Sequence, residues 1–518
     1  MEWRRVCDGI LACVLACCLG YDVWSLARRT EARLNETVQA DWRKAGRLVS
    51  GDDSVAFLVK DVHALHPVER TRLLAVNWNL LPRVARPCAL SDLGGLCEKV
   101  IVTSAFLGKD AVAGLFAHGF CRRQEVGDAC VWRRGEVPRG ACSNPPAAQP
   151  RLWREMLGTG IVCALVALVF AWSARWEGRW DMRRTLVMAV VFAVLSGVTL
   201  ANGFLAPNGL GVYGGKAKLF FCSGGVPDGF WTNPDYVLYQ PSYPPGLAIL
   251  ALVVDVLSGG CGDWFVQLLC PCALAMLAAS IAGNRPSWTM CLATFAFALS
   301  PVSVWLASEF YAEPFAALCL VCGWRRVWTR GGKRGWLVMG CAGLFRHEGV
   351  VAASLLWCAT RMFGTSGRVR LDGLVCAMGL SLAWQVFRFS VAAELPDFDF
   401  SSLPTFGTVA LLSKIALASV LCFWEAGGAV LASALLAAHG CARSVCAAGV
   451  ASALFLVGMC CALSFNRTSY FEWMASNCIP RLVWTILAVV LSGVTVVRQS
   501  TRKEWARGYQ KGQTLLIQ

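Results

Sequence analysis

Three consecutive ionisable residues, Arg346, His347 and Glu348, interrupt an apolar part of the chain in the stretch GLFRHEGVVAAS (343–354). The ten residues before them are apolar or small, and another such run follows. A charged side chain inside a membrane costs at least about 3 kcal/mol and tends to mark a functional cavity. We therefore predict that Arg346 contacts a substrate phosphate and that Glu348 orients Arg346, with a purely internal ion pair of the two as the alternative. His347 receives no role.

Two carboxylates stand beside another apolar segment, in SEFYAEP (308–314). If this turn is helical, the i, i+4 spacing places Glu309 and Glu313 on one face. Glu313 precedes Pro314 at the start of the next expected helix, where a carboxylate also interacts favourably with the helix dipole. Glu313 is thus a candidate catalytic base, and Glu309 is a candidate substrate contact.

A polar loop, 206–243, combines charged residues with five aromatic residues in its second half. Its charged side chains are Lys216, Lys218, Asp228 and Asp235. The aspartates are candidate catalytic bases and the lysines are candidate substrate contacts. The alternative is that the aspartates are ordinary solvated loop residues and that the lysines lie at a membrane surface.

These residue types suit the transfer of a sugar from a lipid phosphate to a hydroxyl group. The acceptor hydroxyl needs a carboxylate within hydrogen-bonding distance to take its proton, and the departing phosphate needs cationic groups. No nucleotide site or other certain cofactor is implied. A metal site built on histidine is not expected, because the chain has five His and no HxxxH pair; a divalent cation is left open.

The elements that must position these residues are predicted to be membrane-spanning helices. Of the 518 residues, 56% are hydrophobic, compared with roughly 45–50% in soluble proteins. The apolar residues gather in blocks near the length of about 20 residues that crosses a membrane, clearly in 159–174, 185–201, 287–306, 445–464 and 482–497. We predict a mainly α, polytopic membrane protein with roughly ten to twelve spans.

The net charge of +15 does not indicate nucleic-acid binding, because many Lys and Arg lie in short segments beside apolar blocks. Such segments are 175–184, 325–334 and 498–511. The positive-inside rule places them in the cytoplasm. The loop 206–243 and Glu313 then face the extracytoplasmic side, either periplasmic or lumenal.

The chain divides into four predicted parts. Residues 1–28 form an N-terminal anchor helix, with a signal peptide as the alternative. Residues 29–153 form a small extracytoplasmic α/β domain with strands expected in 55–59, 73–82, 99–105 and 129–134. Residues 154–497 form the membrane domain, and 498–518 form a basic cytoplasmic tail.

Two parts of the membrane domain are expected not to cross. Segment 243–258 has a double proline and contains Asp255, and a crossing there would place the basic segment 325–334 outside. Segments 336–345 and 349–360 each cover only about half of the hydrocarbon at ~1.5 Å per residue. We expect these two to form a helical hairpin with the charged triad at its tip.

Several segments resemble bacterial GT-C glycosyltransferases, the relatives of protein O-mannosyltransferases and aminoarabinose transferases. The resembling segments are KAKLFFCSGGVPDGFWTNPDYVLYQPSYPPGLAIL, FALSPVSVWLASEFYAEPFAALCLVCGW, GLFRHEGVVAASLLW and SNCIPRLVWTILAVVL. The GPI mannosyltransferase family is a weaker match, because the KAK and YPPG elements fit it less well.

The resemblance implies a GT-C fold and inverting transfer of a hexose or pentose from a polyprenyl-phosphate-sugar to a lipid, glycan or protein acceptor. Positions that match the family pattern are Lys216, Lys218, Tyr243, Glu313, Arg346, Glu348 and Arg481, which adds Tyr243 and Arg481 to the candidate substrate contacts. Where the family often has an Asp before the lysines, this chain has Asn208, which cannot act as a base.

Two other functions stay open. A transporter or flippase of lipid-linked saccharides would have internal repeats, and none is evident in the sequence. A catalytically inactive scaffold with the GT-C fold is the second, because of Asn208. The expected partners are the lipid-linked sugar, its acceptor and membrane lipids, with no nucleic acid.

Overall fold

The computed structural model describes the chain in separate ranges: 55–58, 86–88, 100–104, 115, 120–126, 129–134, 181–202, 208–233, 236, 239–258, 263–283, 286–330, 333–363, 371–390, 451 and 479–493. Within them the protein is mostly helical with a small sheet. The expected anchor 1–28, tail 498–518 and strand 73–82 lie outside the described residues. So do the expected spans 159–174 and 445–464, apart from Ala451.

The sheet has five strands in the order β2-β1-β3-β5-β4. The strands are β1 (Val55–Leu58), β2 (Arg86–Cys88), β3 (Val100–Ser104), β4 (Phe120–Val126) and β5 (Ala129–Arg134). β1 pairs in parallel with β2 and β3, and β5 pairs antiparallel with β3 and β4. The structure confirms the strands expected in 55–59, 99–105 and 129–134.

The two strands that sequence reasoning missed are the two edges of the sheet. β2 contains Pro87, which lacks a backbone N–H and is confined to edge strands or strand ends. β4 carries Arg122, Arg123 and Glu125, and charged residues on an edge strand oppose pairing with another chain. Both features lower the strand signal that hydrophobic alternation provides.

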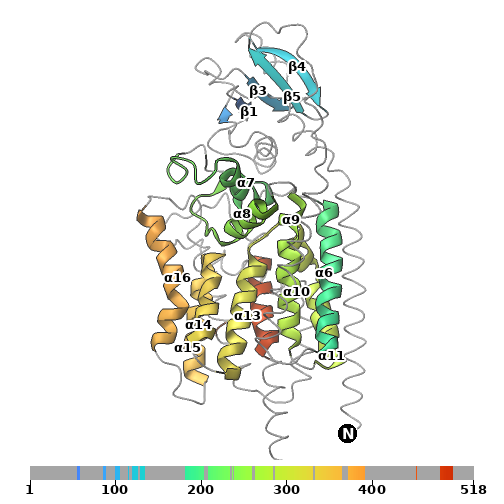
Figure 1. Ribbon diagram of the computed structural model, residues 1–518, viewed down its shortest axis with the longest axis vertical. Coiled ribbons are helices and arrows are strands. Elements are labelled where there is room, and N and C mark those ends of the chain that lie inside the picture. The colour runs from blue at the N-terminus through green and yellow to red at the C-terminus, as the bar shows by residue number, and fades with distance from the viewer. Residues whose placement is uncertain are drawn as a thin grey trace, which may run out of the picture.

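The two faces of the sheet contribute to different cores. Val100, Val102 and Val131 belong to one buried cluster together with Ala217 and Leu247 of the helical part. Ile101, Phe120 and Trp132 form a separate cluster on the opposite face. In Figure 1 the sheet accordingly lies at one end of the helical bundle, beyond α7 (Gly214–Cys222) and α8 (Gly246–Ser258).

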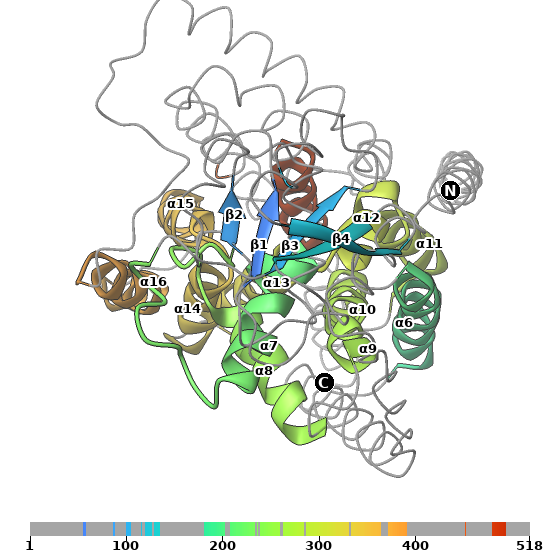
Figure 2. The same cartoon turned by 90° about the horizontal axis from the view of Figure 1, so that it is seen from above.

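Three of the predicted apolar blocks, 185–201, 287–306 and most of 482–497, lie in the remaining described helices. These helices are α6 (Met182–Asn202), the π-helix η2 (Asn208–Val212), α9 (Asp263–Gln267), α10 (Leu269–Ala282), α11 (Trp288–Ala298), α12 (Pro301–Ser308), α13 (Glu313–Arg330), α14 (Lys333–Gly340), the 3₁₀ helix η4 (Cys341–Leu344), α15 (Glu348–Phe363), α16 (Leu371–Ser390) and a C-terminal helix, Ile479–Gly493. Seen from above (Figure 2), α15 and α16 lie on one side of α13, and α6 and α11 lie on the other.

Two of the described helices are long and apolar enough to cross a membrane, namely Met182–Ala201 and Trp264–Ala282. A third candidate is the pair Met290–Ala298 and Pro301–Ser308, which is bent by 50°. The bend has a local cause, because Pro301 lacks an N–H and the Ser300 hydroxyl caps the second helix by accepting from the Ser303 N–H. By contrast α8 has 13 residues, or about 20 Å, which is shorter than the ~30 Å hydrocarbon layer.

Apart from α7, α8 and α9, whose buried residues pack with the sheet, the long helices share one continuous apolar core, which includes the C-terminal helix. Trp484 of that helix is fully buried, stacks on Phe297 at 5.2 Å and donates its indole N–H to the Ser303 hydroxyl at 2.8 Å. These contacts fix the rotation of the C-terminal helix, and therefore the direction of Arg481 one turn earlier.

Glycines make the break between α14 and α15 possible. A Cβ on Gly349 would lie 2.4 Å from the carbonyl carbon of Ala342, whereas a Cβ on Gly379, inside α16, would have no atom within 4 Å. We expect Gly349→Ala to lower the free energy of unfolding by roughly 1–3 kcal/mol, and Gly379→Ala to raise it by about 0.5–1 kcal/mol. Thermal unfolding in lipid nanodiscs measures both, and equal effects of the two substitutions would contradict the described backbone.

Candidate functional site

The turn between α12 and α13 places Glu313. Phe310 in this turn has a φ of +58°, a left-handed value that costs a side-chain-bearing residue energy, and its ring is 1% exposed. The turn is therefore not helical, so Glu309 and Glu313 do not share one helical face. Glu309 ends α12 and is half-buried, whereas Glu313 opens α13 and is buried.

Two arginines bind Glu313 from distant parts of the chain. Its Oε1 accepts a hydrogen bond from Arg481 Nη1 at 2.9 Å and lies 3.5 Å from Arg346 Nε. The Arg481 guanidinium also lies over the Tyr311 ring, 4.5 Å from its centre. A buried carboxylate thus joins α13, the C-terminal helix and the break before α15.

Arg346 connects this pair to a second carboxylate. Its Nη2 donates to Glu348 Oε1 at 2.9 Å, and its backbone N–H donates to the Ala342 carbonyl, which continues the turn from η4. Glu348 is the first residue of α15, where the helix dipole favours a carboxylate. We call Glu313, Arg346, Glu348 and Arg481 the charge cluster; its two positive and two negative charges sum to zero.

Several polar atoms in and beside the charge cluster lack a hydrogen-bond partner. They are Glu313 Oε2, Glu348 Oε2 and the Tyr213 hydroxyl, all buried. Tyr213 directly precedes α7, and its electrostatic neighbours include Arg346, Glu313 and Arg481. Each unsatisfied buried group costs about 1–3 kcal/mol, so their presence together is a reason to place a polar ligand here.

Lys216 of α7 is 1% exposed. Its Nζ donates to the Gln240 carbonyl at 3.0 Å and lies 6.0 Å from the centre of the Phe230 ring. Among the described residues it forms no ion pair. Burial without a counter-ion lowers the pKa of Lys216 from 10.5 to about 7.

The other predicted site residues lie in varied environments. Lys218 and Tyr243 are half-buried, whereas Asp228 is exposed in the turn after α7. The Tyr243 ring contacts His347 at 5.5 Å and lies 5.9 Å from the Arg346 guanidinium. Asp235 lies outside the described residues. Asn208 begins η2, which leads directly into Tyr213 and α7.

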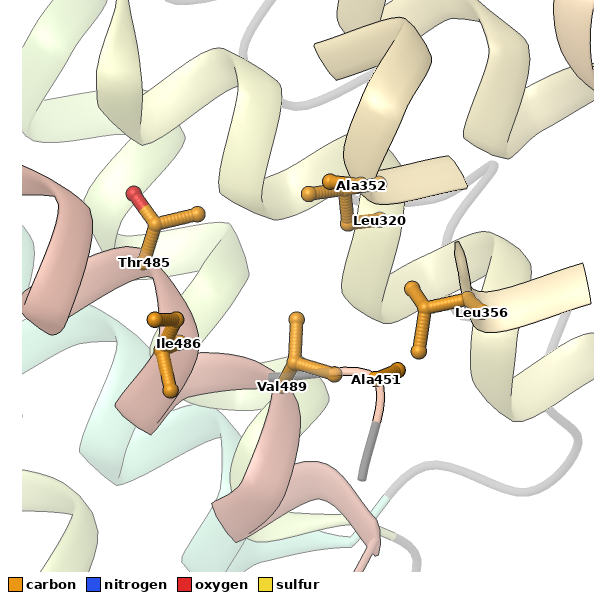
Figure 3. Close-up of a pocket in the computed structure, with 7 residues that line it drawn as sticks. All are labelled: Leu320, Ala352, Leu356, Ala451, Thr485, Ile486 and Val489. Carbon is orange, nitrogen blue, oxygen red and sulfur yellow. The ribbon is translucent and has the colours of Figure 1, made fainter. Parts of the chain in front are cut away.

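An apolar pocket lies close to the charge cluster. It is a small, partly open pocket of about 20 Å³ between α13, α15 and the C-terminal helix, and is lined by Leu320, Ala352, Leu356, Ala451, Thr485, Ile486 and Val489 (Figure 3). Thr485 follows Arg481 by one helical turn and donates its hydroxyl hydrogen to the Arg481 carbonyl at 2.9 Å. The charged and apolar parts are thus adjacent on one helix.

Sequence reasoning missed three residues that line the site, Tyr213, Tyr311 and Gln385. Gln385 of α16 lies 3.1 Å from His347, through Nε2 and Nδ1 respectively. Nothing in the local pattern marks Gln385 or Tyr213, because their relevance depends on long-range packing. Tyr311 had a signal, since it lies in the same short outer segment as Glu309 and Glu313.

No protein-family model matches this chain. No curated protein matches it, and no solved structure does. Within the described residues, no group of three or more His, Cys, Asp or Glu side chains could hold a metal ion.

The ion pair between Glu313 and Arg481 generates the next prediction. Removing one partner of a buried pair leaves an uncompensated charge, which costs about 3–5 kcal/mol. We expect Glu313→Gln and Arg481→Met each to destabilise the protein by that amount. The double variant keeps Arg346 and Glu348 paired and should lose at least about 1 kcal/mol less than the sum of the single losses.

Thermal or denaturant unfolding of the four proteins gives this coupling energy. The control is the exposed pair of Lys333 and Asp372, 2.9 Å apart, whose removal should cost only about 0–1 kcal/mol. Additive losses at Glu313 and Arg481 would show that they do not interact.

Lys216 predicts a pH-dependent stability in the ligand-free protein. With a folded pKa of about 7 and an ordinary value of 10.5, the unfolded chain holds a proton on Lys216 between these pH values that the folded chain lacks. The contribution of this residue therefore becomes more favourable as the pH rises from 7 to 10.5. Lys216→Met should raise the unfolding midpoint by roughly 2–4 °C at pH 6, with a smaller gain at pH 9.5. A gain that does not change with pH would contradict the lowered pKa.

Proposed function

We propose that the chain is an integral, multi-pass membrane glycosyltransferase. In this proposal it transfers a hexose or pentose, with inversion, from a polyprenyl-phosphate-sugar to an extracytoplasmic acceptor. The observation that carries the proposal is that the charge cluster and the apolar pocket follow each other along the C-terminal helix, with Thr485 of the pocket one turn after Arg481. A ligand with an anionic head group on an apolar chain would use both surfaces, because its head group would bind the charge cluster and its chain would lie against the pocket.

The arrangement along the C-terminal helix supports a lipid phosphate. Arg481 sits in the first turn, next to Glu313 and Arg346, and Thr485, Ile486 and Val489 line the pocket further along. A polyprenyl chain lying along this apolar surface would bring its phosphate to the two guanidinium groups. Arginine is well suited to this contact because its planar fork donates two parallel hydrogen bonds to phosphate oxygens.

The two carboxylates of the charge cluster differ in their suitability as a base. Glu313 is 5% exposed and bound by two arginines, whereas Glu348 is 23% exposed and bound by one. Glu348 is the better candidate because its side chain is more accessible to an acceptor and its Oε2 has no hydrogen-bond partner. Glu313, almost fully buried between two arginines, orients Arg346 and Arg481. This differs from the sequence prediction, which gave the role of base to Asp228, Asp235 or Glu313.

The proposed reaction conserves the total charge of the charge cluster and the donor phosphate. The acceptor oxygen attacks the anomeric carbon, its proton passes to Glu348 Oε2, and the bond from the anomeric carbon to the phosphate oxygen breaks. The donor phosphodiester carries one negative charge and the released lipid phosphate carries two. Protonation of Glu348 removes the negative charge that pairs with Arg346. The Arg346 guanidinium can then bind the new phosphate charge, which is the stabilisation that the departing group requires.

The proposal includes a direction in the membrane. The three candidate spans accord with a membrane location, and α7, α8 and the turn 240–243 lie at the sheet end of the bundle (Figure 1). We place that end outside the cytoplasm, because the basic segment 325–334 belongs on the cytoplasmic side under the positive-inside rule.

A transfer assay tests the proposal. The purified protein in nanodiscs is mixed with a polyprenyl-phosphate carrying a radiolabelled hexose and with extracted lipids, glycans and protein as acceptors. We expect label to move to an acceptor fraction and polyprenyl phosphate to be released. Glu348→Gln should lower the rate by about 10²–10⁴-fold, the range for loss of a general base.

Asp372→Asn is the matched control, since it makes the same chemical change at a half-buried carboxylate paired with the exposed Lys333. Loss of transfer in Asp228→Asn with normal transfer in Glu348→Gln would return the role of base to the loop. Movement of the intact donor across the bilayer without transfer would support the flippase alternative, and neither activity would support the inactive scaffold.

A further inference from the structure

Lys216 carries a charge that no described residue neutralises. The carboxylates of the charge cluster, Glu313 and Glu348, are matched by Arg346 and Arg481. Among the described residues no carboxylate lies within ion-pair distance of Lys216, whose side chain is almost fully buried. A buried, uncompensated ammonium group is costly, so an anion that binds beside it gains a large electrostatic term.

The turn 240–243 links Lys216 to the charge cluster. The Gln240 carbonyl accepts from Lys216 Nζ at 3.0 Å and from the Tyr243 N–H at 3.0 Å. Gln240 has a φ of +44°, and such strain in a residue with a side chain clusters at ligand sites. The Tyr243 ring then contacts both His347 and Arg346.

His347 adds a hydrogen-bond donor to the same region. Gln385 Nε2 can only donate, so His347 Nδ1, at 3.1 Å, accepts, and the proton of the neutral imidazole lies on Nε2. That Nε2 is buried and has no hydrogen-bond partner. The charged neighbours of the imidazole are Glu348, Arg346, Arg388 and Lys216.

We propose that Lys216 and His347 form an anion-binding subsite beside the charge cluster, and that it takes a monoanionic group, a carboxylate or a phosphodiester. One uncompensated positive charge matches one negative charge, and a dianion would leave a negative charge unpaired in a buried site. Two Lys216 N–H groups not used by Gln240, together with the His347 Nε2–H, supply three donors.

The position of the subsite indicates which substrate carries the anion. The apolar pocket adjoins Arg481 on the C-terminal helix, so the lipid phosphate of the proposed function belongs to Arg346 and Arg481. Lys216 lies on a different element, α7, at the sheet end of the bundle (Figure 1). We therefore assign the anion to the acceptor; this assignment rests on the proposed function, whereas the subsite does not.

Small anions test the subsite without any transfer assay. The unfolding midpoint of the full chain in nanodiscs is measured at pH 6.5 while sodium acetate, sodium dimethyl phosphate or sodium sulfate replaces sodium chloride at constant ionic strength. We expect acetate or dimethyl phosphate to raise the midpoint by a few degrees in the wild type, in a saturable way. Sulfate should give a smaller shift. The stronger of the two monoanions identifies the group as carboxylate or phosphodiester.

Variants locate the effect. Lys216→Met should abolish the shift and His347→Phe should weaken it severalfold, whereas Lys333→Met, which removes an exposed lysine 67% accessible to solvent, should leave it unchanged. An undiminished shift in Lys216→Met, or a shift lost only in Lys218→Met, would overturn the assignment, as would sulfate binding more tightly than both monoanions. Failure of sugar transfer with a normal anion shift would reject the proposed function and leave the subsite standing.

Discussion

The structure around the site depends on one buried carboxylate, Glu313, that binds two guanidinium groups at once. Its Oε1 holds Arg481 at 2.9 Å and Arg346 at 3.5 Å. Taking these charges out of water costs several kcal/mol per ion, and only close pairing offsets that cost. The pairing therefore requires that α13, the C-terminal helix and the break before α15, which are far apart in the chain, meet at one point. Local features of the turns and helices make this meeting possible.

Three of these local features are a strained backbone angle, a buried indole ring and a glycine. The left-handed φ of Phe310 turns the chain so that Glu313 begins α13, and burial of the Phe310 ring supports the strained backbone. The indole of Trp484, stacked and hydrogen-bonded, fixes the helix that carries Arg481. Gly349 allows α15 to start against Ala342, which leaves Arg346 outside a regular helix and free to reach two carboxylates.

Several helices and part of the site could be predicted from hydropathy and from charged residues inside apolar segments, because these signals depend only on local composition. Apolar blocks correspond to α6, α11 and the C-terminal helix, and a charge in an apolar block must find a partner, which singled out Arg346 and Glu348. The partners themselves are a property of the tertiary fold. Nothing local distinguishes Gln385, which binds His347, from any other amide on a helix, and a resemblance, not spacing, pointed to Arg481.

The turn before α13 and the edge strands of the sheet could not be predicted from sequence patterns, for a physical reason. The i, i+4 rule applied to Glu309 and Glu313 presumes a continuous helix, and a single positive φ at Phe310 removes that premise. Asp228 was as plausible a base as Glu313 in sequence, since residue type does not encode burial; the fold leaves Asp228 exposed. β2 and β4 escaped notice because edge strands avoid the alternation that identifies a strand.

The number of oppositely charged partners distinguishes the two glutamates of the charge cluster from each other, and Lys216 from the two arginines. Glu313, almost fully buried between two arginines, suits a fixed, orienting role. Glu348 has one arginine and a more accessible side chain, which is why we propose it as the base. Lys216 has no counter-ion among the described residues, which is why we propose that a ligand supplies the missing charge. The charge cluster is neutral by itself, whereas Lys216 beside it adds one uncompensated positive charge. In our proposal one anion binds at Lys216 while the charge cluster keeps its own ion pairs.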